Sequence, residues 1–220
     1  MEIIIDISKY VLIFTALFLA PITHELAHGY MAYYLGDPTA KLAGRLSINP
    51  IKHIDPFGTI ILPILLWSAG FFPLIIFKPV PINPLYFKNP KKDNMKVAIA
   101  GPAMNFFWVI LTSLLLRILL MFPSLANSSL LIFLTNYFFM WFIMVNLVLG
   151  LFNLMPFPPL DGSWILLGLL PDKYAYYFEK ARPVVAIAFF LLVITGIFQK
   201  YIFRYLFAIL KKLTLFLIFS

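Results

Sequence analysis

Cysteine is absent from this chain of 220 residues, and charged side chains make up only 12% of it. The missing thiols exclude disulfide bonds and thiolate metal sites. Charged residues are scarce, 62% of the residues are hydrophobic and the mean hydropathy is +0.95. This composition excludes an ordinary soluble domain. The chain is also too short for a helical bundle plus a sizeable soluble domain. We therefore expect one membrane-embedded domain over residues 1–220.

Acidic residues are few, and the net charge is +8. No RNA- or DNA-binding motif accompanies this charge, so nucleic acid is not an expected partner. Basic loops flanking membrane segments explain the charge more simply. The first apolar run begins with the acidic "MEIIIDISKY" and lacks a small-residue cleavage site, so a cleaved signal peptide is not expected.

Long apolar runs dominate the rest of the chain, and a membrane-spanning helix needs roughly 20 such residues. The sequence predicts an all-α polytopic membrane protein with about four to six transmembrane segments. Five long apolar runs cover about 10–35, 57–77, 95–122, 129–155 and 183–199. A sixth run, 201–219, is interrupted by Arg204, Lys211 and Lys212, which predicts an interfacial segment or a poor span.

Two segments depart from the plain helical pattern. Residues 40–49, "AKLAGRLSIN", alternate between apolar and polar side chains, which predicts a short β-hairpin or edge strand that could hold an extended substrate; an ordinary polar loop is the alternative. Residues 57–77 contain Pro63, Gly70 and Pro73, which predict a re-entrant segment. A straight membrane crossing is the alternative interpretation of that run.

The sequence "HELAH" at residues 24–28 carries the most specific chemical pattern. His24 and His28 are four residues apart, so on a helix they share a face and can bind one metal ion. Glu25 can then act as a general base on water at that ion. Two interfacial histidines beside a glutamate are the alternative, but ionisable groups at membrane depth cost at least ~2.5 kcal/mol each and call for a function.

A third metal ligand must come from elsewhere in the chain. The remaining candidates are His53, Asp55, Asp161 and Glu179. We favour Asp161, because it alone ends a long apolar segment, in the proline-rich "PFPPLDG", where Gly162 would permit a turn. A plain surface turn is the alternative for these letters.

Three motifs in this order, "HELAH", "AGPAMN" and "NLMPFPPLDG", resemble the site-2 protease family of intramembrane zinc metalloproteases. The resemblance covers residues 20 to about 165 and is to the short form without PDZ or nucleotide-sensing domains. It implies regulated intramembrane proteolysis, in which a peptide bond within or near a transmembrane helix of another membrane protein is hydrolysed. A non-proteolytic zinc-binding scaffold and a transporter are the alternatives; an intact Glu25 argues against the first, and the lack of an inverted repeat argues against the second.

The resemblance also assigns roles to residues. It implies a Zn²⁺ ion held by His24, His28 and Asp161, with Glu25 as the catalytic base. Asn153 is implied to contact substrate or the tetrahedral intermediate. Asn105 is a weaker candidate for that role, with packing as the alternative. We expect His53 not to bind zinc; it either has no role or contacts substrate or supports the site at the cleft mouth.

The position of the motifs predicts the depth and side of the site. In a helix over 10–35, His24 lies about 21 Å from the start and about 16 Å from the end, inside the bilayer but nearer the loop 36–56. Eleven of the seventeen basic residues fall in 36–56, 78–94 and 171–182 or at Lys96, which makes this side cytoplasmic. We expect an integral protein of a prokaryotic cell membrane, whose partners are lipid and a transmembrane substrate. The sequence is also compatible with a homo-oligomer.

Overall fold

A computed structural model of the chain describes residues 2–71 and 75–197 and the single residues 200, 208 and 212. The predicted all-α class is confirmed for this part of the chain, where every regular element is a helix and no strand occurs. The described helices are, in chain order, α1 (Glu2–Tyr34), α2 (Thr39–Leu42), η1 (Pro50–His53), η2 (Pro56–Ile61), α3 (Leu62–Ser68), η3 (Pro84–Tyr86), α4 (Pro90–Leu120), α5 (Pro123–Ala126), α6 (Ser129–Leu134), η4 (Thr135–Phe139), α7 (Met140–Asn153), α8 (Asp161–Leu169) and α9 (Asp172–Ile194).

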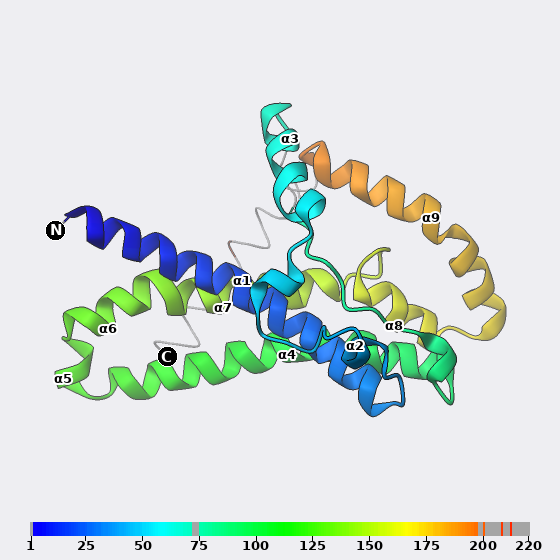
Figure 1. The fold of residues 1–220 in the computed structure, drawn as a ribbon, viewed down its shortest axis with the longest axis horizontal. Helices are drawn as coiled ribbons and strands as arrows, with labels where there is room; N and C mark the ends of the chain where they lie inside the picture. The colour runs from blue at the N-terminus through cyan, green and yellow to red at the C-terminus, as the bar shows by residue number, and fades with distance from the viewer. Residues whose placement is uncertain (1, 72–74, 198–199, 201–207, 209–211, 213–220) are drawn as a thin grey trace.

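Three long helical runs lie side by side and form the body of the molecule (Figure 1). They are α1, α4 and the continuous run α6–η4–α7, and α4 runs antiparallel to the other two. The fully buried Leu116 and Ile143 pack α4 against α7, while Ala16 and Ala20 of α1 pack against Phe142. Small residues such as these alanines let helices approach closely, which favours association inside a bilayer.

The three runs are also the described helices that are long and apolar enough to span a membrane, over Ile5–Tyr34, Pro90–Leu120 and Ser129–Asn153. The predicted stretch 183–199 falls partly in α9, whose first half is charged, so α9 does not meet this standard. The stretch 201–219 lies outside the described residues except for 208 and 212. The described chain therefore supports three of the four to six predicted segments.

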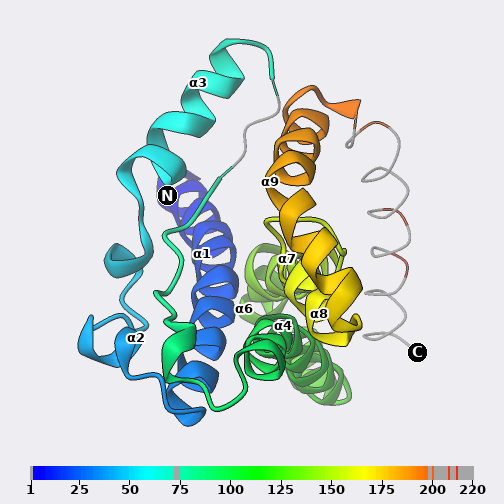
Figure 2. The same ribbon diagram turned by 90° about the vertical axis from the view of Figure 1, so that its right-hand side faces the viewer.

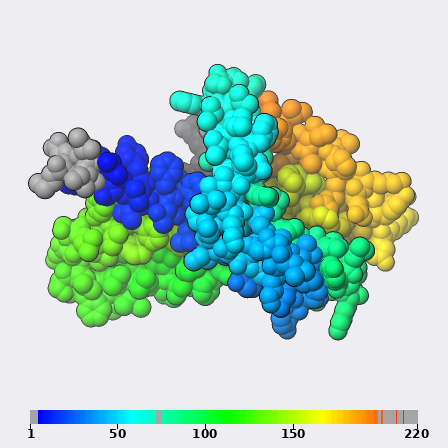
Figure 3. All heavy atoms as spheres, viewed as in Figure 1, coloured from blue at the N-terminus to red at the C-terminus, as the bar shows by residue number. Residues whose placement is uncertain are grey.

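The two described ends of the run 57–77 lie together. After η2 and α3, the Ile76 N–H donates to the Gly58 carbonyl over 3.0 Å, and the Thr59 hydroxyl donates to the Ile76 carbonyl over 2.6 Å. The re-entrant segment and the straight crossing both stay predictions. Figure 3 shows α3 standing out from the body of the molecule.

The predicted β-hairpin at 40–49 is absent. Residues Thr39–Leu42 form the single helical turn α2, and residues 43–49 follow without a strand. The cause lies just upstream, where the Asp37 carboxylate accepts hydrogen bonds from both the backbone N–H and the hydroxyl of Thr39. This Asx turn favours a helical turn directly after Asp-Pro, and it outweighs the weak alternation that follows.

The end of α1, the start of α4 and the start of α8 meet at one end of the bundle (Figures 1 and 2). Ala32 of α1 and Val97 of α4 pack against Phe87 from the loop between them. Lys91 at the start of α4 donates to the Leu170 carbonyl and to the Asp172 carboxylate, both over 2.6 Å, and so ties α4 to the link between α8 and α9. This arrangement brings the three sequence motifs to one place.

Candidate metal centre

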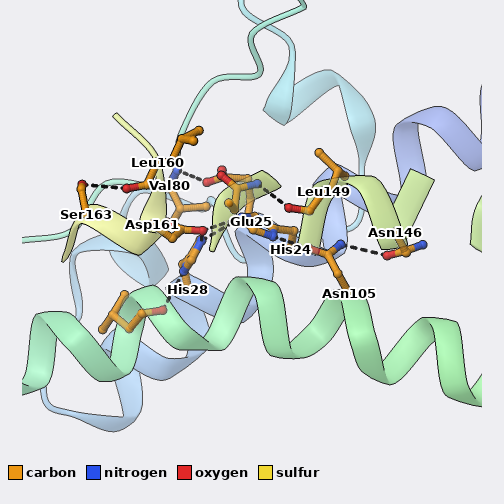
Figure 4. A network of polar contacts seen from close by, with 12 residues as sticks. His24, Glu25, His28, Val80, Asn105, Asn146, Leu149, Leu160, Asp161 and Ser163 are labelled. Atoms are coloured by element: carbon orange, nitrogen blue, oxygen red, sulfur yellow. Dashed lines mark hydrogen bonds and ion pairs between the residues drawn. The ribbon is translucent and has the colours of Figure 1, made fainter. Parts of the chain in front are cut away.

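His24, His28 and Asp161 converge at this end of the bundle (Figure 4). The Nε2 atoms of the two imidazoles are 3.0 Å apart. Oδ2 of Asp161 lies 3.1 Å from Nε2 of His24 and 3.3 Å from Nε2 of His28. Both histidines are 6% exposed, so the group sits among protein atoms and not at the surface. It is the one such metal-binding group found among the described residues.

The Nδ1 atom of each imidazole lies within hydrogen-bonding distance of an oxygen atom. Nδ1 of His28 lies 2.7 Å from the backbone carbonyl of Val97, and Nδ1 of His24 lies 2.6 Å from Oδ1 of Asn105. A carbonyl oxygen can only accept, so Nδ1 of His28 carries the proton and its Nε2 presents a lone pair. The same pattern holds for His24 with the side-chain oxygen of Asn105. Histidine ligands of metals commonly donate their other N–H to an oxygen in this way.

The convergent atoms fit a zinc ion. Two imidazole lone pairs and a carboxylate oxygen face one another, and Oδ2 of Asp161 has no hydrogen-bond donor among the described residues. Such a cluster of acceptors is repulsive unless a cation lies between them. Tetrahedral zinc with bonds of 2.0–2.2 Å holds its ligand atoms about 3.3 Å apart, close to the separations observed. Three protein ligands leave a fourth position for water, as in catalytic zinc sites.

Gly101 of α4 lets the two histidines lie against that helix. A Cβ atom at this position would overlap the imidazoles of both His24 and His28. Gly101 belongs to the motif "AGPAMN", but its role was not predicted from the sequence. A glycine within a helix often marks the close approach of a neighbouring group, so this residue could have indicated the contact.

Asp161 begins α8, directly after the irregular residues 154–160. Gly162 does not serve a turn, as the sequence suggested, because it lies within the first turn of α8. Its role is close approach: a Cβ atom there would overlap the carbonyl oxygens of Leu154 and Met155. The buried Ser163 hydroxyl donates to the Leu160 carbonyl over 2.7 Å. These contacts fold the proline-rich segment against α8 and fix the backbone that carries the Asp161 carboxylate.

Glu25 lies at the boundary of two clefts. One cleft, with a volume of about 330 Å³, contains the three metal-binding side chains together with Asn94 and Trp164. The other, of about 290 Å³, is largely apolar and is lined by residues of α1, α7 and α9 and by residues 75–77. Oε2 of Glu25 accepts a hydrogen bond of 2.9 Å from the backbone N–H of Val80.

The other predicted site residues occupy different positions. Asn153 lines both clefts beside Glu25, and its Nδ2 donates to the Leu149 carbonyl over 3.0 Å. Asn105 is fully buried between helices and lines neither cleft. His53 is also fully buried, and its imidazole binds the Ser47 carbonyl over 2.6 Å. It is not part of the described metal-binding group.

Comparisons with known proteins give the class of this arrangement. Residues 124–196 match the family model described as Peptidase family M50. "Putative zinc metalloprotease YwhC" of Bacillus subtilis (strain 168) is 41% identical over 172 residues, which cover 78% of this chain and 75% of that protein. "Putative zinc metalloprotease Rip2" of Mycolicibacterium smegmatis is 26% identical over 159 residues, covering 71% of this chain and 56% of the relative.

A third relative, "Zinc metalloprotease MJ0392" of Methanocaldococcus jannaschii, is 28% identical over 167 residues, covering 76% of this chain and 37% of the relative. No solved structure matches the chain at a comparable level of significance. All three relatives carry names that describe them as zinc metalloproteases, two of them as putative ones, which agrees with the class that the resemblance implied. The chain belongs to peptidase family M50, the site-2 protease family.

Proposed function

We propose that this protein hydrolyses a peptide bond within or near a transmembrane helix of a membrane-protein substrate, with a Zn²⁺ ion held by His24, His28 and Asp161. The observation that carries the proposal is the convergence of three ligand atoms 3.0–3.3 Å apart on a cleft that also contains Glu25. A scaffold with a structural zinc ion does not need the Glu25 carboxylate, and no inverted repeat favours a transporter.

Bound zinc acts as a Lewis acid, polarising the scissile carbonyl and lowering the pKa of water towards ~7. Glu25 takes the proton of the attacking water on its carboxylate and later delivers it to the departing amide nitrogen. Proton transfer of this kind contributes roughly 10²–10⁴-fold to the rate. The Val80 N–H holds one carboxylate oxygen of Glu25, which leaves the other oxygen to carry the proton.

Asn153 is placed to bind the reacting segment of the substrate. Asn153 lines both of the clefts that Glu25 also lines. A carboxamide so placed can donate to the substrate carbonyl or to the oxyanion that forms from it. The anchoring contact to the Leu149 carbonyl, over 3.0 Å, limits its rotation.

The two clefts suit different parts of the reaction. The apolar cleft is lined by Phe152 of α7 and by Phe189 and Phe190 of α9, so it suits the apolar side chains of an unwound transmembrane segment. The other cleft holds the polar groups His24, Asn94 and Asp161, and it suits the entry of water. Water thus reaches a site at membrane depth through protein and not through lipid.

We propose that this end of the bundle faces the cytoplasm of a prokaryotic cell and that residues 57–77 re-enter the membrane. Eleven of the seventeen basic residues lie in 36–56, 78–94 and 171–182 or at Lys96, a distribution that the positive-inside rule associates with the cytoplasmic side. Residues 58 and 76 meet, and α3 exposes Ile64, Leu65 and Trp67. Exposed apolar side chains on a segment that doubles back fit a re-entrant element in lipid.

The test is cleavage by the detergent-purified protein of a peptide that contains one transmembrane helix. Cleavage should stop when a chelator removes the metal and return when zinc is restored. Glu25→Gln keeps the shape of the side chain but cannot accept the proton, so it should retain zinc and lose roughly 10²–10⁴-fold in cleavage rate. Wild-type turnover in a zinc-loaded Glu25→Gln variant would remove Glu25 from the mechanism, and zinc binding without any proteolysis would favour a scaffold.

A further inference from the structure

Two asparagines form a buried chain of hydrogen bonds behind the metal centre. Asn105 of α4 and Asn146 of α7 are both 0% exposed. Nδ2 of Asn105 donates to Oδ1 of Asn146 over 2.9 Å, and Nδ2 of Asn146 donates to the Phe142 carbonyl over 2.8 Å. The other end of the chain is the contact of 2.6 Å between Oδ1 of Asn105 and Nδ1 of His24 (Figure 4).

The direction of every bond in this chain is set at the Phe142 carbonyl. That oxygen can only accept, so the side-chain nitrogen of Asn146 must face it and the side-chain oxygen must face Asn105. Asn105 then presents its nitrogen to Asn146 and its oxygen to His24. The proton of His24 must therefore sit on Nδ1, and Nε2 is left with the lone pair that a metal needs.

The reverse arrangement is disfavoured by burial. If Asn105 turned its nitrogen towards His24, the proton of His24 would move to Nε2 and block the metal. Asn146 would then have to place its oxygen against the Phe142 carbonyl, or Asn105 would face it oxygen to oxygen. Either choice leaves two buried acceptors in contact, and water has no access to a pair of fully buried side chains to relieve them.

We propose that Asn146 is a positioning residue for the metal centre: acting through Asn105, it selects the tautomer of His24 that binds the ion. The proposal rests on the proposed zinc site. In this proposal Asn105 orients the metal ligand His24 through its Nδ1 atom and does not contact the substrate. His28 needs no such relay, because a backbone carbonyl already fixes its tautomer.

A purely structural role is the alternative, because asparagines also join helices inside membranes through hydrogen bonds. The two roles differ in what they affect. A structural bond supports the packing of α4 on α7 and has no preference between the two nitrogens of His24. A tautomer-selecting bond acts on zinc affinity and on the ligand field of the ion, even when the helices stay packed.

The experiment measures the zinc dissociation constant of the purified full-length protein by competition with a chromophoric chelator, together with the visible spectrum of the Co²⁺-loaded form. Asn146→Leu removes both hydrogen-bonding groups at similar volume and should weaken zinc binding at least about tenfold. Ile143→Val, at a fully buried position on the same face of α7, is the packing control and should leave zinc affinity unchanged. Asn146→Ser should restore much of the affinity, because a helical serine donates to the carbonyl four residues back and still accepts from Asn105.

Combining Asn146→Leu with a second substitution, Asn105→Asp, separates an effect on the orientation of His24 from an effect on helix packing. Asn105→Asp gives His24 a carboxylate, which presents an acceptor whichever way it turns. In this background Asn146→Leu should cost little or no further zinc affinity. An equal loss in both backgrounds would assign Asn146 a structural role and overturn the proposal.

Two further results would count against the proposal: wild-type zinc affinity in a folded Asn146→Leu variant, or a Co²⁺ spectrum that this change leaves unmoved. These outcomes are distinct from failure of the proposed function. If the wild-type protein does not bind zinc through His24, the zinc site itself is wrong, whereas tight wild-type binding that ignores Asn146 rejects only the relay. If Asn146→Leu does not fold, the Asn146→Ser variant still decides the question, because the relay requires it to retain much of the zinc affinity, and loss of zinc from a folded Asn146→Ser variant would overturn the proposal.

Discussion

The backbone N–H of Val80 donates a hydrogen bond to Oε2 of Glu25, with the two atoms 2.9 Å apart. Val80 belongs to a segment, residues 78–83, that lies across the end of the bundle and is fastened at both ends. Arg45 donates to the Lys78 carbonyl over 2.8 Å, and the Asn83 N–H donates to the Asp37 carboxylate over 2.7 Å. The loop that follows residues 57–77 thus fixes the orientation of the proposed base.

Val80→Pro tests this contact directly. Proline removes the N–H but suits an extended backbone between Pro79 and Pro81. We expect turnover to fall on the order of 10–10²-fold, because a misplaced catalytic group loses alignment with the reacting atoms, while zinc content stays at the wild-type level. The measurement is kcat and bound zinc on one preparation.

Val80→Ala is the matched control, since it shortens the same buried side chain but keeps the N–H. Its turnover should stay much closer to wild type than that of Val80→Pro. Equal losses in the two variants would show that the side chain matters and the hydrogen bond does not.

The metal ligands can be tested by zinc content alone. Asp161→Ala removes the carboxylate that faces both imidazoles, so zinc per chain should fall well below that of the wild type. Glu179→Gln changes a carboxyl group of α9 that lies outside the described metal-binding group, and zinc content should not change. An empty site in Glu179→Gln with a full site in Asp161→Ala would reverse the assignment.

The sequence predicted the chemistry of the site better than its surroundings. The spacing of His24 and His28 is a local property of a helix, and Asp161 stood out because it follows an apolar run in an irregular segment. Both inferences need only short-range geometry. The two clefts and the contact between Glu25 and Val80 depend instead on how a loop 55 residues away folds over α1, which no local pattern contains.

The error at residues 40–49 has the same origin. Their alternation is too short to outweigh the Asx turn of Asp37 with Thr39, so a helical turn formed where a hairpin was predicted. The role of Asn105 stays a prediction, which rests on the rule that a buried polar residue in an apolar helix calls for a function. Which function it has depends on the face that α4 turns towards α1 and α7, and that face is set by packing.

Gly101→Ala should disrupt the metal site through sterics. The added methyl group would overlap both imidazoles, so either α1 and α4 separate or the histidines leave their rotamers. Overpacking of this kind costs typically about 1–3 kcal/mol, or roughly 5–150-fold in zinc affinity if the strain falls on the ligands. The zinc dissociation constant, measured by chelator competition, is the readout.

Gly168→Ala is the matched control, because the methyl group added there meets the side chain of Met95 and neither imidazole. Zinc affinity should be close to wild type in this variant. If Gly101→Ala binds zinc as tightly as Gly168→Ala does, the close approach of α1 to α4 is not needed for the site.

The absence of cysteine makes the membrane topology directly testable by single-cysteine labelling. Lys52 and Lys88 are exposed and flank residues 57–77, while Ser124 is exposed in α5, which lies at the other end of the bundle. If residues 57–77 re-enter from the cytoplasm, Lys52→Cys and Lys88→Cys should both resist a membrane-impermeant maleimide on intact cells and react after permeabilisation. Ser124→Cys should react on intact cells. A single crossing by 57–77 would instead place Lys52 and Lys88 on opposite sides, and labelling of one but not the other would reject both the re-entrant segment and the cytoplasmic approach of water to the zinc.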